Sequence, residues 1–344
     1  MKKNSKPKGF FIKRRSLLKG AGLGAGIALA SKIFRPAILN AGPLDRIKAS
    51  KGGESKKPDA GAGLSIILLG TGTPLPNKDR ACASTLVLAG DKAFLVDTGR
   101  GFLTRFADTG LRDVDAVFIT HYHSDHFGEL GEFLVTRTIW GASKPLTVFG
   151  PPGLKDVTGG VIAAYALDNK YRKAHHQDKW SEDAMKVVAT ESGPGVVYEK
   201  DGVKVTMFEV DHAPVKPAMA YRFDYKGQVV VISGDTKKNQ AMVDMAKNAD
   251  ILVHEVVNKQ MTEIGQRMVD ARMQEMATEM LQYHTTTEEV AEIARDANVK
   301  KLVLTHFAPS LPENAAMEAM FIRGMSGIYK GEIIVGRDGL QVKA

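Results

Sequence analysis

The chain has a single cysteine, Cys82, among its 344 residues. One thiol cannot form a disulfide within the chain or a cysteine-based zinc knuckle, so both are excluded. We therefore expect Cys82 to be a small buried residue. The rest of the composition, with 44% hydrophobic and 25% charged residues, is that of an ordinary globular protein, and a single α/β domain can reach this length.

Acidic residues are absent from residues 1–30, which hold eight of the 47 lysines and arginines. The rest of the chain then carries 39 basic and 39 acidic side chains, so the formal net charge of +8 belongs to this segment alone. A body without net charge has no global field for a polyanion. Nucleic acid is therefore disfavoured as a partner.

The N-terminal segment also lacks an apolar run long enough to span a bilayer, so no stable membrane anchor is expected. Arg14 and Arg15 precede a short glycine-rich apolar stretch that ends in Ala28-Leu29-Ala30. This arrangement is typical of a bacterial signal peptide, here of the twin-arginine type. The alternative is a disordered basic tail with chance alanines.

We accordingly expect three parts: a signal peptide over residues 1–30, a flexible linker over residues 31–63 and a folded body over residues 64–344. The twin-arginine export machinery would carry the folded protein, so we expect a periplasmic or secreted location.

In the folded body, short apolar runs alternate with helical patterns. Strands are predicted at 65–69, 85–88, 94–96, 116–120, 203–208, 218–223, 229–232, 251–254 and 302–305. Helices are predicted at 129–140, 239–247 and 288–296, and the last follows a capping box formed by Thr286 and Glu289. Two halves, each with antiparallel-looking strands followed by helix-flanked strands, predict an α/β fold, specifically an αββα sandwich.

Methionines recur at helical spacing over residues 259–283. We expect this stretch to be a helix packed on the core. An adaptable apolar lid or partner surface is the alternative. The stripe consists of Met261, Met268, Met273, Met276 and Met280.

The strongest chemical signal is a loop after the strand at 116–120, which packs three imidazoles and a carboxylate into six residues. Without sulfur, nitrogen and oxygen donors of this kind are the ligands that zinc favours. Such groups are costly to bury without partners. The loop therefore predicts a metal site formed by His121, His123, Asp125 and His126.

With this loop the sequence resembles the metallo-β-lactamase superfamily, whose signature is H-x-H-x-D-H. Within it, the sequence is most similar to the ribonuclease Z and arylsulfatase-like branch. The motifs that carry this likeness are Leu68-Leu69-Gly70-Thr71-Gly72-Thr73-Pro74, Val96-Asp97-Thr98-Gly99, Asp211-His212, Ser233-Gly234-Asp235-Thr236, Val253-His254-Glu255, His284-Thr285-Thr286-Thr287 and Val303-Leu304-Thr305-His306-Phe307.

The resemblance implies two divalent metal ions, with zinc favoured, held by seven ligands. One ion would bind His121, His123 and His212, the other would bind Asp125, His126 and His306, and Asp235 would bridge them. Asp97 would orient a ligand histidine through its other ring nitrogen. His284 would form hydrogen bonds near the site rather than bind metal, and His175 and His176 would be exposed to solvent.

For catalysis, the resemblance points to Asp125, His254 and Glu255. We expect His254 to be the general acid, with Glu255 holding its orientation. The hydroxide shared by the two metals would attack a small phosphodiester or sulfate ester. Alternatives are a 3′-tRNA-processing-type endoribonuclease, a lactone or β-lactam hydrolase, and a non-catalytic metal-binding protein; a homo-oligomer is left open.

Two further observations favour a small ester over precursor tRNA. Ribonuclease Z-like enzymes carry a tRNA-gripping arm as an insertion near the segment from Phe223 to Val229, which is short here. An exported protein would also not meet precursor tRNA.

Overall fold

The computed structural model describes residues 63–344. The predicted signal peptide, and the predicted linker apart from residue 63, lie outside this range. In the described range, strand β1 begins at Leu64. No helix there combines the length and apolarity needed to cross a membrane.

Seven strands form the first sheet, in the order β14-β1-β2-β3-β4-β5-β6. Strands β14, β1, β2 and β3 are antiparallel to one another in turn, and β3 to β6 are parallel. Their bounds are β1 (Leu64–Gly70), β2 (Ser84–Ala89), β3 (Lys92–Val96), β4 (Ala116–Phe118), β5 (Leu146–Gly150), β6 (Val187–Glu191) and β14 (Gln341–Lys343).

The second sheet repeats this plan in the order β13-β12-β11-β10-β9-β8-β7. Strands β7 to β10 are antiparallel, and β10 to β13 are parallel. Their bounds are β7 (Gly195–Lys200), β8 (Val203–His212), β9 (Val215–Tyr225), β10 (Gln228–Ile232), β11 (Ile251–Val257), β12 (Lys301–Ala308) and β13 (Glu332–Val335).

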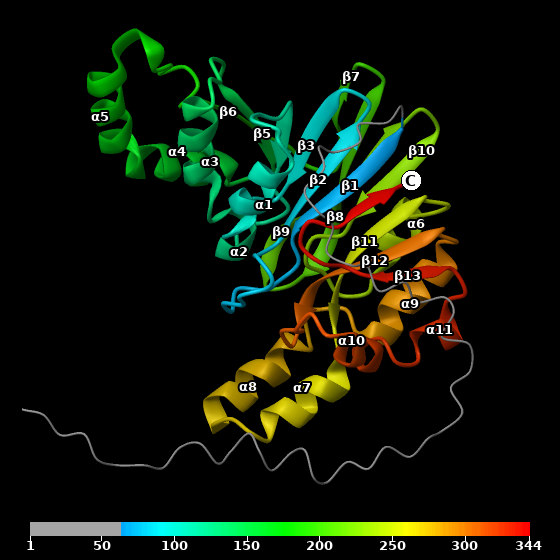
Figure 1. The fold of residues 1–344 in the computed structure, drawn as a ribbon. Helices are drawn as coiled ribbons and strands as arrows, with labels where there is room; N and C mark the ends of the chain where they lie inside the picture. Colours follow the sequence, from blue (N-terminus) through cyan, green and yellow to red (C-terminus); the bar gives the residue numbers. More distant parts are fainter. Residues whose placement is uncertain (1–62) are drawn as a thin grey trace, which may run out of the picture. The chain divides into compact units, whose positions relative to one another are not determined.

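Three apolar clusters show that the sheets pack face to face with helices outside (Figure 1). Phe94 and Phe118 of the first sheet meet Phe223 of the second between the sheets. Helices α1, α3 and α4 cover the first sheet, and α6, α9, α10 and α11 cover the second. The helices are α1 (Phe102–Asp108), α2 (Ser124–Phe127), α3 (Leu130–Ile139), α4 (Leu154–Ala164), α5 (Ala166–His176), α6 (Gln240–Met245), α7 (Lys259–Gln266), α8 (Ala271–Met280), α9 (Thr287–Asp296), α10 (Ala315–Phe321) and α11 (Met325–Ile328), with a 3₁₀ turn η2 (Gln177–Lys179).

The predicted αββα sandwich is therefore confirmed. The capping box of α9 is also present, because the Glu289 side chain accepts a hydrogen bond from the Thr286 backbone N–H and the Thr286 hydroxyl accepts one from the Glu289 N–H. Between β9 and β10 only the turn at Lys226 and Gly227 intervenes, so no arm is inserted there.

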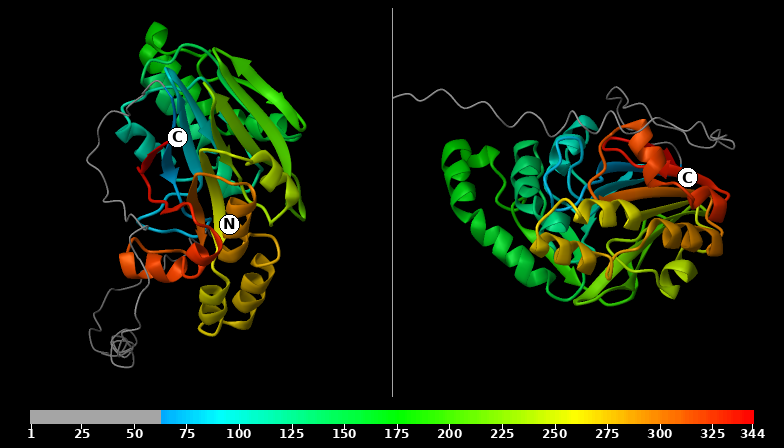
Figure 2. Two further views of the ribbon diagram at one scale, coloured as in Figure 1. Left: turned by 90° about the vertical axis from the view of Figure 1, so that its right-hand side faces the viewer. Right: turned by 90° about the horizontal axis from the view of Figure 1, so that it is seen from below.

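The expectation for the methionine-rich stretch was wrong. Residues 259–283 form two helices, α7 and α8, joined as a hairpin that stands out from the sheets (Figures 1 and 2). Only Met261 packs partly against the core, while Met268, Met273 and Met276 are exposed. Helical periodicity indicated a common face but could not show whether that face is covered.

The C-terminus returns to the start of the folded body. Strand β14 pairs with β1 at the edge of the first sheet, and the Ala344 N–H donates to the Leu64 carbonyl at 3.0 Å.

Candidate metal centre

The first part of the site is the loop that follows β4. His123 is the N-cap residue of the short helix α2, so Asp125 and His126 lie in its first turn. His121, Asp125 and His126 are buried, and His123 is exposed. This turn brings four ligating side chains within one loop.

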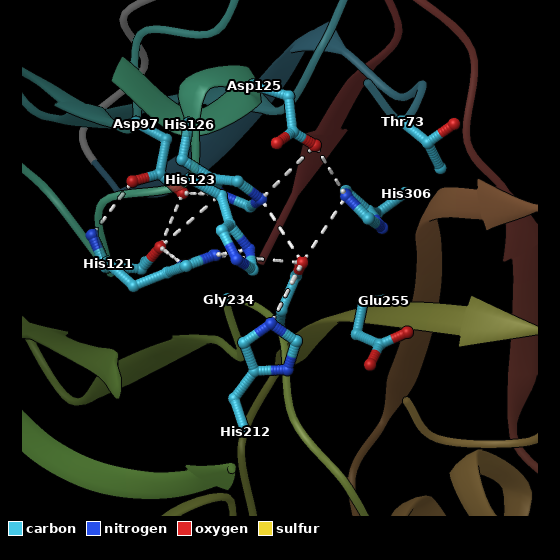
Figure 3. A network of polar contacts seen from close by, with 12 residues as sticks. Thr73, Asp97, His121, His123, Asp125, His126, His212, Gly234, Glu255 and His306 are labelled. Atoms are coloured by element: carbon cyan, nitrogen blue, oxygen red, sulfur yellow. Dashed lines mark hydrogen bonds and ion pairs between the residues drawn. The ribbon is translucent and has the colours of Figure 1, made fainter. Parts of the chain in front are cut away.

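The second part comes from strand ends of the other sheet. His212 ends β8 and Asp235 follows β10. His306 lies near the end of β12, where its φ of 49° departs from extended strand geometry. All three side chains are buried. Figure 3 shows that the side chains of His212 and His306 point toward the histidines and the aspartate of the loop that follows β4.

Asp235 stands at the centre of the assembled donors. Its Oδ2 lies 3.4 Å from His126 Nε2, 3.5 Å from His306 Nε2, 3.8 Å from His121 Nε2 and 3.9 Å from His212 Nε2. The donor atoms fall into groups within 4.8 Å: His121, His123, His212 and Asp235 form one, and Asp125, His126 and His306 form another. The structure thus brings together the residues that the resemblance implied for the two ions, with Asp235 between the two groups.

The chemistry of these donors fits two divalent ions. Several buried polar atoms in the cluster have no hydrogen-bond partner, including His126 Nε2, His212 Nε2 and Asp235 Oδ1. An unpartnered buried polar atom costs about 1–3 kcal/mol. Coordination of a metal would satisfy them with the nitrogen and oxygen ligands that zinc accepts.

Burial and local charges shift the pKa values of the donors in different directions. Burial alone would lower the pKa of His126, but the carboxylates of Asp235 and Asp97 raise it well above its usual range. The pKa values of His121 and Asp235 are instead shifted toward the forms that bind metal. Burial lowers the pKa of His121 well below its usual range, with neighbouring His126 adding to the effect. Burial alone would raise the pKa of Asp235, but the imidazoles of His306 and His126 hold it well below its usual range. A neutral imidazole and an ionised carboxylate are the ligand forms that a metal requires.

Asp97 holds this arrangement from behind. Its Oδ2 lies 2.7 Å from His126 Nδ1 and accepts a hydrogen bond from the Thr120 hydroxyl, while Oδ1 accepts one from the Thr120 N–H. The carboxylate thereby directs His126 Nε2 toward the cluster, in line with what the resemblance implies for Asp97.

His284 and Glu255 form a second buried pair beside the metal donors. His284 Nδ1 lies 2.9 Å from Glu255 Oε1, and the same oxygen accepts hydrogen bonds from the N–H groups of Thr236 and Thr285. Burial alone would lower the pKa of His284, but the Glu255 charge raises it to about 9. One potential ligand atom from each of His284, Asp235 and His306 lies within 4.8 Å of the other two, so His284 lies at the edge of the cluster.

This pairing was missed in the sequence, where Glu255 was assigned to orient His254. The structure instead buries His254 completely, with its Nδ1 2.7 Å from the Glu255 backbone carbonyl. Among the described residues, His254 belongs to none of the groups that could hold a metal. The assignment of His254 as general acid stays a prediction without a contact to the donor cluster.

Tyr283 is a further residue that the sequence did not reveal. Its backbone carbonyl lies 3.0 Å from His212 Nδ1 and leaves Nε2 of that ring for the cluster. His175 and His176 are exposed on α5, as expected, and Cys82 is buried with its thiol near the Thr73 carbonyl.

Two packed mixed sheets with outer helices, and at their edge a His/Asp cluster that could hold metal ions, are the architecture of the metallo-β-lactamase fold. A model of the family described as anti-Pycsar protein Apyc1 matches residues 64–325. Ribonuclease Z of Mycobacterium bovis is 38% identical over 281 residues, covering 80% of this chain and 96% of that protein. Ribonuclease Z of Mycolicibacterium paratuberculosis is 39% identical over 280 residues, with the same coverage.

Solved structures show the same fold at lower identity. YhfI, a metallo-β-lactamase fold protein from Bacillus subtilis, matches with a TM-score of 0.60 at 19% identity and covers 82% of this chain and 99% of its own. The short form of human tRNase Z matches with a TM-score of 0.59 at 22% identity, with coverages of 81% and 98%.

The chain therefore belongs to the Apyc1 family of metallo-β-lactamase-fold hydrolases and is a homologue of ribonuclease Z. Among the predicted functions, these relatives favour the alternative of a 3′-tRNA-processing-type endoribonuclease over the main prediction of an enzyme for a small phosphodiester or sulfate ester. The arylsulfatase likeness and the export route stay predictions.

Proposed function

We propose that this protein is a dinuclear metal-dependent phosphodiesterase with chemistry of the ribonuclease Z kind. The observation that carries the proposal is the position of Asp235, whose Oδ2 lies within 3.9 Å of four imidazole nitrogens drawn from both ligand groups. A carboxylate placed there can be shared by two ions. Two ions at such a site supply an activated water and neutralise the charge that develops on phosphoryl oxygens.

The chain's own residues supply the remaining chemistry. His126 is directed by Asp97, and His212 by the Tyr283 carbonyl, so the donor nitrogens face the cluster without reorganisation. Because Nδ1 of His284 is engaged by Glu255, its Nε2 is the nitrogen left for a substrate. We assign to His284, rather than His254, the transfer of a proton to the departing oxygen.

The substrate class supported by the described surface is a small phosphodiester. The two-residue turn between β9 and β10 holds no inserted arm, and the chain beyond residue 30 has no net charge. Affinity for a polyanion depends largely on lysine and arginine contacts to phosphate. The second candidate, 3′ processing of precursor tRNA, is supported by the 38% identity to ribonuclease Z.

A direct comparison of substrates tests the proposal. The zinc-loaded protein should hydrolyse bis-(p-nitrophenyl) phosphate, and removing metal with a chelator should abolish this activity. Parallel assays use a nitrophenyl sulfate, a nitrophenyl phosphomonoester, a β-lactam and a precursor tRNA. Faster turnover of the tRNA would select the second candidate, and no turnover of any substrate at full metal content would refute hydrolysis.

The proton-donor assignment predicts a dependence on the leaving group. His284→Ala should lose roughly 10²–10⁴-fold in rate on an alkyl phosphodiester, the usual contribution of a general acid. It should lose much less on the nitrophenyl diester, because nitrophenolate departs without protonation. Steady-state rates on both substrates, with metal content measured in parallel, check this.

His254→Asn is the matched variant for that experiment. It should affect both substrates to the same degree, because its ring is buried against its own backbone. If His254→Asn shows the leaving-group dependence and His284→Ala does not, the original assignment of His254 holds.

We also propose export through the twin-arginine route, supported by Arg14 and Arg15 ahead of a short apolar stretch. Changing both arginines to lysine should leave uncleaved protein in the cytoplasm, measured by cell fractionation and blotting. Normal periplasmic levels of the variant would contradict this route and favour general secretion.

A further inference from the structure

His306 reaches the metal centre from an irregular position in strand β12. The pairing of β11 with β12 shifts register between Thr305 and Phe307, so His306 is an extra residue in that pairing. Its φ of 49° lies in the left-handed region, which costs free energy for a residue with a side chain. A bulge of this kind turns a side chain away from its ordinary strand direction. Other parts of the protein must therefore hold this backbone in place.

The ring of His306 has less support than the rings of His126 and His212. Asp97 faces Nδ1 of His126, and a backbone carbonyl faces Nδ1 of His212. His306 directs its Nε2 toward Asp125, at 3.2 Å (Figure 3), but its Nδ1 has no hydrogen-bond partner among the described residues. The orientation of this ring therefore depends on the backbone of residue 306 rather than on a group behind the ring.

A buried guanidinium contacts the segment that follows His306. Arg80 is 3% exposed and lies in the connection between β1 and β2. Its Cζ lies 4.5 Å from the centroid of the Phe307 ring, within cation–π distance. Its Nε donates to the Leu311 carbonyl at 2.6 Å, shortly after the end of β12. The Phe307 N–H donates at 3.2 Å to the carbonyl of Thr71, in the same connection as Arg80. The connection between β1 and β2 thus holds the chain on the C-terminal side of His306.

The same guanidinium also reaches the segment that precedes His306. Nη1 of Arg80 donates to the Gly336 carbonyl at 2.8 Å and to the Thr71 hydroxyl at 2.7 Å. The Gly336 N–H in turn donates at 3.0 Å to the carbonyl of Leu304, two residues before His306. Arg80 therefore links the β1–β2 connection, strand β12 and the end of β13 around the irregular residue.

We propose that Arg80 is the positioning residue for His306, and thereby for the ion site formed by Asp125, His126 and His306. It acts through the backbone on both sides of a ring that lacks other support. A planar guanidinium can donate to several carbonyls at once in a fixed geometry, which a lysine ammonium cannot reproduce. This inference rests on the proposed metal centre, because it takes His306 as a metal ligand.

A purely structural role is the alternative for Arg80, and Arg137 offers the matched comparison. Arg137 is also buried, at 2% exposed, and it donates to the Asp113 carboxylate and to the carbonyls of Lys144 and Ala184. These partners precede β4, β5 and β6, whereas the ligand loop follows the C-terminal end of β4. Loss of either guanidinium should lower stability, but only loss of Arg80 should change the metal centre.

Metal affinities separate the two roles. In Arg80→Met, the affinity for one of the two zinc ions should fall by about tenfold or more, as when other groups that orient a ligand are lost. The affinity for the other ion should stay unchanged, and Arg137→Met should leave both affinities unchanged. Arg80→Lys keeps the charge beside Phe307 but not the planar fork, so it should lose less affinity than Arg80→Met. Competition with a chromophoric chelator measures these affinities, and far-ultraviolet circular dichroism shows that each variant is folded.

A second measurement does not depend on metal. In NMR spectra of the metal-free protein labelled at its histidine rings, the His306 signal is assigned from its absence in His306→Gln. This signal should shift in Arg80→Met and stay in place in Arg137→Met. An unshifted signal in Arg80→Met, or unchanged affinities for both ions, would overturn the role of Arg80, as would an equal effect of Arg137→Met. A parent protein that binds fewer than two ions would refute the proposed metal centre, whereas the signal shift would still support the positioning of His306 by Arg80.

Discussion

The first sheet supplies four of the proposed metal ligands from a single loop, His121 to His126, whereas the second supplies one from each of three strand ends. In the loop, the turn of α2 sets the distances between donors. In the second sheet, the distances between donors depend on the pairing of strands β8 to β12. They therefore depend on the whole fold. The two halves should therefore respond differently to substitution. A change in the loop should alter the affinity of one metal ion, whereas a change at the strand ends should alter whether both ions are held together.

The largest effect on metal content and activity is expected at Asp235, because this residue of the second sheet lies close to both groups of metal donors. Asp235→Ala should reduce metal content from about two ions per chain to about one, because no carboxylate remains to be shared. Phosphodiesterase activity should fall by at least about a hundredfold. Metal analysis after dialysis and steady-state rates measure both effects.

Asp244→Ala, at an exposed carboxylate on α6, is the control and should change neither quantity. Two retained ions and full activity in Asp235→Ala would mean that Asp235 does not bridge the two ions. The ligands of the second sheet would then each bind a single ion, as the loop ligands do.

A smaller effect is expected behind the loop of the first sheet. Asp97→Asn removes the charge that faces His126 Nδ1 and should weaken metal affinity by about 10–100-fold, the usual result of losing such an orienting carboxylate. Competition with a chromophoric chelator measures the affinity. His175→Asn, outside the site, should have no effect, and an unchanged affinity in Asp97→Asn would show that the turn of α2 positions His126 unaided.

The smallest effect tests the support of the second sheet without touching a ligand. Thr286→Ala removes the N-cap of α9, which packs on β11, and should lower the free energy of unfolding by about 1 kcal/mol. Urea unfolding of the metal-free protein measures this. Metal content should stay at two ions, and its loss would show that the strand-end ligands depend on this helix.

The same contrast explains what could be predicted from the sequence. The loop ligands follow from local spacing alone. His212, Asp235 and His306 also follow, because each comes at or near the end of a recognisable strand and the resemblance supplied their roles. Polar groups at neighbouring strand ends meet at one edge of a sheet, as they do here.

The remaining features depend on contacts that local patterns do not encode. Glu255 pairs with His284, 29 residues away, and the α7–α8 hairpin separates them. Its neighbour His254 was the more obvious partner in sequence. The exposed face of the hairpin was misassigned for a related reason, because the spacing of Met268 to Met280 is the same whether the helix is covered or not.

The pairing of β14 with β1 has a consequence for the edge of the first sheet. Strand β14 occupies the outer side of β1, and the Ala344 N–H donates to the Leu64 carbonyl there. An edge strand that is left unpaired can pair with other chains. A variant that lacks β14 would keep every proposed metal ligand and yet expose the edge of β1, so this short strand protects the first sheet from association without taking part in the site.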